Sequence, residues 1–201
     1  LVTVRGLGTA AARVARIGEI MGFLDGQPAW RGARIAYLQG DASTRGYARL
    51  SGKDGTTLLM DAPRQPDGPP IRDGRAYSQI AHLAEDMVRP FVAAGGVLRQ
   101  AGLSAPAVLA AEFDQSLLLV ADLGDRLFGA ELAQGRPQAP MWRAAVDALL
   151  HLRRIPVPAA LAVPDGSSYR LPRRDRAAFE IEIELLLDWA WPQLKGAPAP
   201  A

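Results

Sequence analysis

A short polar turn between two apolar runs holds the side chains best suited to chemistry in this sequence. The runs span 35–38 and 47–50, and five residues of the turn could face a ligand: Gly40, Asp41, Ser43, Thr44 and Arg45. Backbone N–H groups of a glycine turn between strands can bind nucleotide phosphates, and a guanidinium can hold a phosphate through two parallel hydrogen bonds. The turn therefore indicates a phosphate site. The alternative is that its short polar side chains only satisfy their own backbone.

Two apolar runs further along the chain could line the same site. The run 57–61 contains Met60 where a kinase-type strand carries the lysine that holds the nucleotide phosphates. The run 117–120 ends in residues whose backbone groups could pair with the edge of an adenine: Val120, Ala121 and Asp122. For these residues a strand end followed by a helix cap is the equal alternative.

Three other motifs favour structural roles. Residues 5–11 match a loose glycine fingerprint of dinucleotide folds, but no second strand follows their helix, so an ordinary strand-to-helix turn explains them. His82 and His151 have no partners at the spacing of a catalytic triad or a metal site. Neither histidine therefore indicates a catalytic triad or a metal site.

Glu180 and Glu184 lie one helical turn apart and would share a face of a helix. They could form a carboxylate pair for a metal ion. The favoured interpretation is a solvated stripe beside a core stripe of Ile181, Leu185 and Trp189.

Composition limits the class of protein. With 201 residues, 49% of them hydrophobic, the chain can bury one core, or a small lobe plus part of a second. Its 23 basic and 21 acidic residues leave a formal charge of +2, and this mixed surface offers no case for nucleic acid. The sequence has no cysteine, no run of eighteen apolar residues and no signal-peptide pattern. We expect a cytoplasmic location and no membrane contact.

Apolar runs and turn residues predict an α+β fold. Short strands are expected at 2–4, 35–38, 47–50, 57–61, 108–110 and 117–120. Helices are expected at 9–24, 82–101, 127–134, 140–154 and 173–191. Thr9 would cap the first helix, and Pro90 would bend the second or mark its true start. The proline-containing segments 63–74 and 155–172 are expected to be loops. A strand-rich first part and a helical second part favour the α+β class.

Six segments, taken in their order along the chain, resemble the aminoglycoside phosphotransferase-like kinases. They are 40–50, 59–63, 89–91, 101–106, 118–125 and 184–189. The resemblance is closest to the bacterial branch of cell-wall sugar kinases that act at the anomeric carbon of N-acetylmuramate and N-acetylglucosamine. It implies a protein-kinase-like small lobe, with a five-stranded antiparallel sheet plus a helix, followed by the first helices of a helical large lobe. It also implies ATP, Mg²⁺ and a small sugar substrate as ligands.

The resemblance divides the chain into four parts. Residues 30–121 would be the nucleotide-binding small lobe and 122–192 the connector and a truncated large lobe, before a Pro/Ala-rich tail at 193–201. Residues 1–26 resemble the tail of the ATPase subunit of the tRNA threonylcarbamoyladenosine system, as part of a preceding domain or an N-terminal extension. The family's His-x-Asp loop, downstream Asn and second Asp for Mg²⁺ do not occur here. We therefore expect the catalytic base and the Mg²⁺ ligands outside this fragment, and no activity from it alone.

The resulting hypothesis is the ATP-binding part of an amino-sugar phosphotransferase. The turn around Gly40 and Arg45 would lie over the phosphates, Met60 near the inner face of the nucleotide, and the backbone from Val120 to Leu123 along adenine. The alternative is a non-catalytic kinase-like interaction module that binds proteins of the threonylcarbamoyladenosine system.

Overall fold

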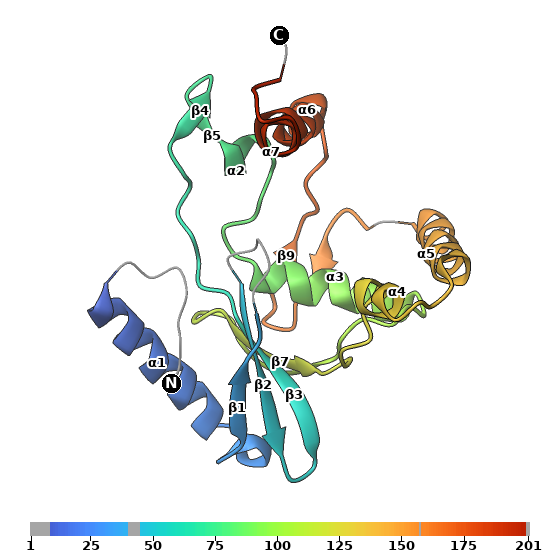
Figure 1. Ribbon diagram of the computed structural model, residues 1–201. Helices are drawn as coiled ribbons and strands as arrows, with labels where there is room; N and C mark the ends of the chain where they lie inside the picture. The colour runs from blue at the N-terminus through green and yellow to red at the C-terminus, as the bar shows by residue number, and fades with distance from the viewer. Residues whose placement is uncertain (1–8, 40–44, 157, 200–201) are drawn as a thin grey trace.

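The computed structural model describes residues 9–39, 45–156 and 158–199 (Figure 1). Its centre is a five-stranded antiparallel sheet in the order β1-β2-β3-β7-β6. The strands are β1 (Arg34–Tyr37), β2 (Gly46–Gly52), β3 (Gly55–Asp61), β6 (Val108–Glu112) and β7 (Leu117–Ala121). Each contains or overlaps one of the apolar runs identified above, so the predicted sheet is confirmed. The strand expected at 2–4 lies outside the described residues.

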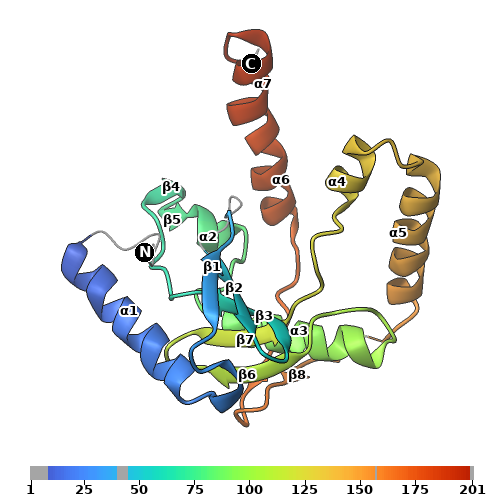
Figure 2. The ribbon, with the colours of Figure 1, turned by 60° about the horizontal axis from the view of Figure 1, so that its bottom comes forward.

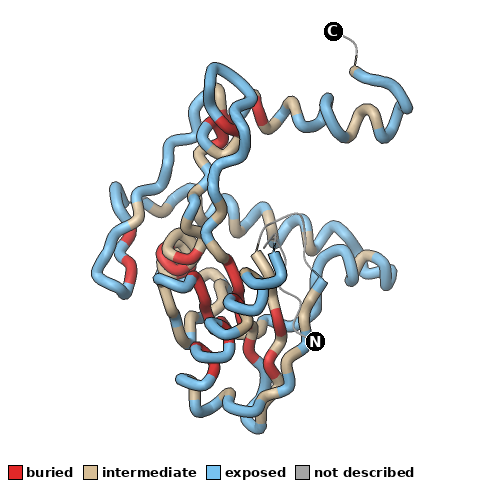
Figure 3. The backbone as a smooth tube through the Cα atoms, turned by 90° about the vertical axis from the view of Figure 1, so that its left-hand side faces the viewer, coloured by how far each residue is buried: buried red, intermediate tan, exposed pale blue. Residues whose placement is uncertain are grey.

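The two faces of the sheet are buried by different helices. On the outer face, Leu50, Leu59 and Leu119 pack against α1 (Ala10–Asp25). On the inner face, Met60 and Leu118 pack against α3 (Val88–Gln100). Figure 1 shows the two helices on either side of the strands, and Figure 3 shows the buried residues concentrated in the sheet and its immediate surroundings. Because successive strand residues point to opposite faces, nearly continuous apolar strands such as β7 are expected between two helices.

Helix α1 begins as predicted. The Thr9 side chain accepts a hydrogen bond of 3.2 Å from the N–H of Ala12, which satisfies one of the unpaired donors of the first turn. Further along, Arg16 reaches the sheet and forms a buried ion pair with Asp61 of β3 at 2.7 Å. This helix falls in the segment 1–26 assigned above to a preceding domain or an extension. Through Arg16 and the apolar contacts of Ile20 and Phe23, it contributes to the core of the lobe.

Helix α3 starts six residues later than the predicted helix 82–101. The backbone N–H groups of Val88 and Arg89 donate to the Asp86 carboxylate, at 2.9 and 3.2 Å, so that Asp86 caps the helix there. Pro90 lies in the first turn, where its missing N–H costs nothing. Pro90 therefore marks the start of the helix rather than a bend within it.

The segment 63–74 is not only a loop as predicted. It contains β4 (Pro70–Arg72), which pairs with β5 (Arg75–Ala76) across a turn with left-handed φ at Asp73 and Gly74. Such a primed turn matches the twist of a two-residue hairpin. A short helix α2 (Tyr77–Ile80) follows and leads into the linker before α3.

Helices dominate after β7, as the sequence indicates. They are α4 (Phe128–Ala133), α5 (Gln138–Arg153), α6 (Arg176–Leu185), a π-helical segment (Leu186–Ala190) and α7 (Trp191–Lys195). A small hairpin of β8 (Leu161–Ala162) and β9 (Ser168–Tyr169) interrupts the loop predicted at 155–172. No helix in the described ranges is long and apolar enough to cross a membrane.

The predicted core stripe on the last long helix is only partly present. Ile181 is buried against Ile80 of α2, but Leu185 and Trp189 are 38% and 71% exposed. Figure 2 shows the reason: α6 and α7 project from the rest of the chain, so most of their surface has no neighbouring element. The apolar periodicity correctly identified a helix but not which of its residues would be covered.

Candidate functional site

The strand register separates two ends of the inner sheet face. At one end Gly46, the first residue of β2, lies opposite Asp61, the last residue of β3. At the other end Ala121, the last residue of β7, lies opposite Thr57. The two β3 residues at these ends, Thr57 and Asp61, are four positions apart along the strand, a span of about 13 Å. The predicted phosphate turn enters β2 at the first end, and the connector leaves the sheet at the second.

The predicted phosphate turn can be followed only in part. Gly40, Asp41, Ser43 and Thr44 lie outside the described residues. Arg45 is described, half-buried, immediately before β2. A phosphate contact by any of these five residues stays a prediction.

Met60 is a core residue of the inner face. Its side chain is fully buried, packs with Val88 and Val92 of α3, and accepts a hydrogen bond of 3.4 Å from the Tyr47 hydroxyl on its sulfur. Tyr47 lies directly opposite Met60 on β2, so the two side chains occupy the same face. A contact between Met60 and a nucleotide stays a prediction.

The connector residues already have partners within the protein. The Val120 carbonyl accepts a hydrogen bond of 2.7 Å from the buried Thr57 hydroxyl, and the Ala121 N–H donates to the Ala107 carbonyl at 2.8 Å. The Asp122 carboxylate accepts from the Gly124 N–H at 2.9 Å. Leu123 is 60% exposed. The predicted adenine contact at these residues stays a prediction; the structure shows internal backbone hydrogen bonds at Val120 and Ala121.

Arg49 forms a cluster with Asp122 and Asp125 that the sequence reasoning missed. Its Nε and Nη2 donate to Asp122 at 2.7 and 3.2 Å, and its Nη1 and Nη2 donate to Asp125 at 3.0 and 2.7 Å. Arg49 lies opposite Leu58, which lies opposite Val120, so its side chain leaves β2 on the inner face beside the connector. Both partners belong to the quoted segment 118–125 and Arg49 to the segment 40–50, but their separations of 73 and 76 residues gave no local signal.

The Arg49 cluster sets the charge state of both carboxylates. Burial alone would raise the pKa of Asp122, but hydrogen bonds from Arg49, the Gly124 N–H and Thr56 hold the pKa below its ordinary value. The hydrogen bond from Arg49 likewise lowers the pKa of Asp125, and the two carboxylates raise the pKa of Arg49. At neutral pH the cluster therefore carries two negative charges and one positive charge beside the connector.

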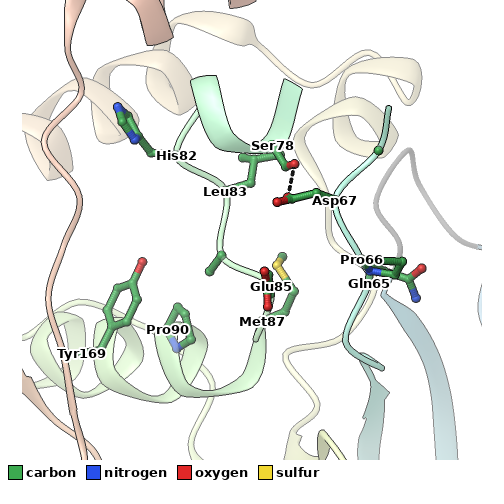
Figure 4. A pocket seen from close by; sticks show the side chains of 12 residues that line it. Gln65, Pro66, Asp67, Ser78, His82, Leu83, Glu85, Met87, Pro90 and Tyr169 are labelled. Carbon is green, nitrogen blue, oxygen red and sulfur yellow. Dashed lines mark hydrogen bonds between the residues drawn. The ribbon is translucent and has the colours of Figure 1, made fainter. Parts of the chain in front are cut away.

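A pocket of about 590 Å³ is lined in part by the segment that follows the end of β3 at Asp61 (Figure 4). We call it the α2–α3 pocket, because α2, the linker after it and the first turn of α3 form most of its wall. The segment that follows β3 contributes Gln65, Pro66 and Asp67, and β9 contributes Tyr169. In Figure 4 the Tyr169 hydroxyl points toward the middle of the pocket, and Leu83 projects from the linker.

His82 anchors the linker that lines this pocket. It follows α2 with a left-handed φ of 54°, a conformation usually taken by glycine at a helix end. Its Nε2 lies 2.9 Å from an Asp175 oxygen, and the other Asp175 oxygen caps α6 by accepting from the Ala178 N–H at 2.9 Å. The sequence offered His82 no partner because Asp175 is 93 residues away. His151 lies 2.7 Å from the Ala101 carbonyl and has a structural role.

The described residues were compared with the ligand sets that a metal ion needs. Across residues 9–39, 45–156 and 158–199, no group of three or more His, Cys, Asp or Glu side chains could hold one. Glu180 pairs with Arg176, and Glu184 pairs with Arg72 of β4. Arginine partners favour the surface-stripe interpretation of these two glutamates over a metal-binding pair.

The fold and the arrangement of the site define a class. A five-stranded antiparallel sheet in this order, one helix on its inner face and a connector into helices form a kinase-like small lobe followed by helices. No family model matches the chain. Three curated relatives match the chain, and the three carry the same name.

The relatives are N-acetylmuramate/N-acetylglucosamine kinases. That of Caulobacter vibrioides is 38% identical over 160 residues, which cover 76% of this chain and 44% of the relative. Those of Pseudomonas aeruginosa and Pseudomonas putida are each 30% identical, over 157 and 153 residues, covering 38% and 35% of the relatives. Over the matched residues the chain is similar to these sugar kinases. It spans less than half the length of each of these relatives.

Proposed function

We propose that this chain is the ATP-binding portion of an amino-sugar phosphotransferase. The observation that carries the proposal is the 38% identity to an N-acetylmuramate/N-acetylglucosamine kinase over 160 residues. A fold by itself hosts many functions, so the sequence match, rather than the sheet, supports the choice of reaction. The kinase-like sheet order agrees with it.

The proposed nucleotide lies along the inner face between the two sheet ends. Adenine would lie at the connector, beside the Arg49 cluster, and the phosphates at the end where Gly46 meets Asp61. The span of about 13 Å between these ends suits an extended nucleoside triphosphate. Arg45, which precedes Gly46, would contact a phosphate at this end.

Mg²⁺ would accompany ATP and neutralise charge on the transferred phosphate. We propose, from the resemblance to the kinases, that its protein ligands lie in a part of the family fold outside this chain. The same holds for the catalytic base. The role of this portion is to bind and orient ATP.

Thermal unfolding of the 201-residue chain with and without ATP and Mg²⁺ tests the proposal. ATP at a hundred times its Kd would stabilise the chain by about 2.7 kcal/mol, or roughly 5–10 °C in Tm. Arg45→Ala should weaken ATP binding about tenfold or more, because a charge-assisted hydrogen bond is lost. Lys53→Ala, in the turn after β2 and so at the opposite end of that strand from Arg45, is the matched control and should bind ATP like the wild type.

An unchanged Tm at saturating ATP would contradict the proposal. It would favour the alternative of a non-catalytic module, for which a protein of the threonylcarbamoyladenosine system, and not ATP, should raise the Tm.

A further inference from the structure

We propose that Arg16 of α1 is a positioning residue for the triphosphate, and that it acts through Asp61 on Gly46 at the start of β2. This inference rests on the proposed function. It gives α1, which the sequence analysis placed in a preceding domain or an extension, a part in binding the nucleotide.

The strand register connects Asp61 to the end of the sheet where the phosphates are proposed to lie. Asp61 is the last residue of β3 and lies opposite Gly46, which follows Arg45. A Cβ placed on Gly46 would lie 3.7 Å from the Asp61 carbonyl oxygen and 3.8 Å from the Asp61 Cβ. The two strands are therefore in close contact at this end, so a displacement of Asp61 would move Gly46 with it.

Arg16 holds Asp61 from the outer face of the sheet. Its Nε and Nη2 donate to Oδ1 of Asp61 at 3.0 and 2.7 Å, and Nη2 also reaches the Ser116 carbonyl at 3.4 Å. The same carbonyl accepts a hydrogen bond of 3.1 Å from the Ala62 N–H. The guanidinium therefore joins the end of β3 to the turn before β7, in directions that its planar shape fixes.

The ion pair between Arg16 and Asp61 is shielded from water. Arg16 is 5% exposed and Asp61 is 7% exposed, and hydrogen bonds in such a site are stronger than in solvent. The Tyr37 hydroxyl is buried on the same face, where burial and the charge of Asp61 raise its pKa. A buried ion pair adds little net stability over apolar residues of similar size, so its contribution here is a directed contact.

Arg16 and Arg49 act on opposite ends of the proposed nucleotide. Arg49 ties β2 to the connector, where adenine is proposed to lie, through Asp122. Arg16 fixes the other end, where the phosphates are proposed to lie, through Asp61. Supporting contacts of this kind hold binding groups in the geometry that a ligand needs. Loss of the Arg16 contact should therefore affect a ligand with phosphates and spare a ligand without them.

Titration of the full 201-residue chain with two ligands tests the inference: ATP with Mg²⁺, and adenosine, which has no phosphate. The double variant Arg16→Met with Asp61→Leu should stay folded, because packed apolar side chains can replace a buried ion pair. It should bind ATP about fivefold more weakly, the scale on which a residue outside the site changes binding. Its affinity for adenosine should stay within about twofold of the wild type, since the connector end is unchanged. A general loss of stability would not separate the two ligands in this way.

Three further variants complete the comparison. Glu19→Ala removes the partly exposed partner of Arg16 but leaves Asp61 in place, so the affinity for ATP should not change. Asp61→Asn keeps an acceptor oxygen for the guanidinium and should bind ATP within about twofold of the wild type. Arg49→Lys, at the connector end, should instead weaken the binding of ATP and adenosine together.

Three results would overturn the inference: wild-type ATP affinity in the folded double variant, equal losses of affinity for ATP and adenosine, or a loss in Asp61→Asn as large as in the double variant. In each case ATP binding by the wild type, measured in the same series, would leave the proposed function standing.

Arg16→Lys gives the same comparison if the double variant does not fold. A lysine ammonium cannot reproduce the planar, two-donor contact with Asp61, so ATP should again bind more weakly while adenosine binds as before. An unchanged affinity for ATP in Arg16→Lys would then overturn the inference. Absence of ATP binding by the wild type would count against the proposed function, and the inference would fall with it.

Discussion

Arg49 of β2 and Asp122 of the connector meet in two hydrogen bonds of 2.7 and 3.2 Å, although 73 residues separate them. The same guanidinium holds Asp125 through two further bonds. The end of β7 is thus tied to β2 across β3 by a rigid, planar group. Lysine could not replace it, because a single ammonium cannot reach four oxygens in this geometry.

We predict that Arg49→Lys lowers both the Tm and the affinity for ATP. The Tm should fall by about 2–4 °C, because the connector loses its attachment to β2. Differential scanning calorimetry measures the change in Tm, and titration with ATP measures the change in affinity. Arg34→Lys, on the exposed edge strand β1, is the control and should change neither quantity. Wild-type ATP affinity in Arg49→Lys would show that the cluster does not position the connector for the nucleotide.

The Arg49 cluster should also make stability depend on pH. Asp122 and Asp125 have lower pKa values in the folded chain than in the unfolded chain, so the unfolded chain binds more protons and stability rises with pH. Their contribution is complete above an ordinary aspartate pKa of about 3.9 and is lost as the pH falls through the lower folded values. The difference in Tm between the wild type and Arg49→Gln should therefore shrink from pH 6 to pH 2.5. A constant difference over this range would argue against the pKa shifts.

The buried ion pair between Arg16 and Asp61 should be needed for stability. Asp61→Ala would leave the buried Arg16 charge with only its partly exposed partner Glu19 and should cost about 3–5 kcal/mol, measured by urea unfolding. Replacing both residues by apolar ones, Arg16→Met with Asp61→Leu, should recover most of this loss. Glu19→Ala removes only the partly exposed partner of Arg16 and should change stability by no more than about 1 kcal/mol. If the double variant loses as much stability as Asp61→Ala, the ion pair would stabilise the fold beyond neutralising the buried charge of Arg16.

Tyr37→Phe should leave stability unchanged or increase it by up to about 1 kcal/mol. The Tyr37 hydroxyl is buried without a hydrogen-bond partner in the described structure, and burial, with the nearby charge of Asp61, raises its pKa. Removing an unsatisfied polar group saves its desolvation cost. Tyr47→Phe is the contrasting variant, since it deletes the hydrogen bond to Met60 and should be mildly destabilising. Thermal unfolding of both variants gives the comparison, and a clear loss in Tyr37→Phe would reveal a partner for its hydroxyl.

Local patterns predicted the elements of this fold well. Apolar runs between turn residues identified all five strands of the sheet, Thr9 located the start of α1, and Pro90 lies in the first turn of α3. These signals depend on residues a few positions apart, which sequence shows directly. The hairpin β4–β5 was missed because the four prolines of segment 63–74 suggested a loop, although one of them begins β4. The Asp73-Gly74 turn that forms the hairpin is a short-range signal of it.

Sequence by itself determined the sheet, its helices, the resemblance to sugar kinases and the list of residues suited to bind a nucleotide. Tertiary structure alone decided that Arg49 meets Asp122, that His82 meets Asp175, and that the segment after β3, α2 and its linker, α3 and β9 line one pocket. It also decided that Leu185 and Trp189 stay exposed. The physical reason is that strand pairing and helix propensity are set by neighbouring residues, while contacts between side chains 70 to 90 positions apart depend on how the finished elements pack.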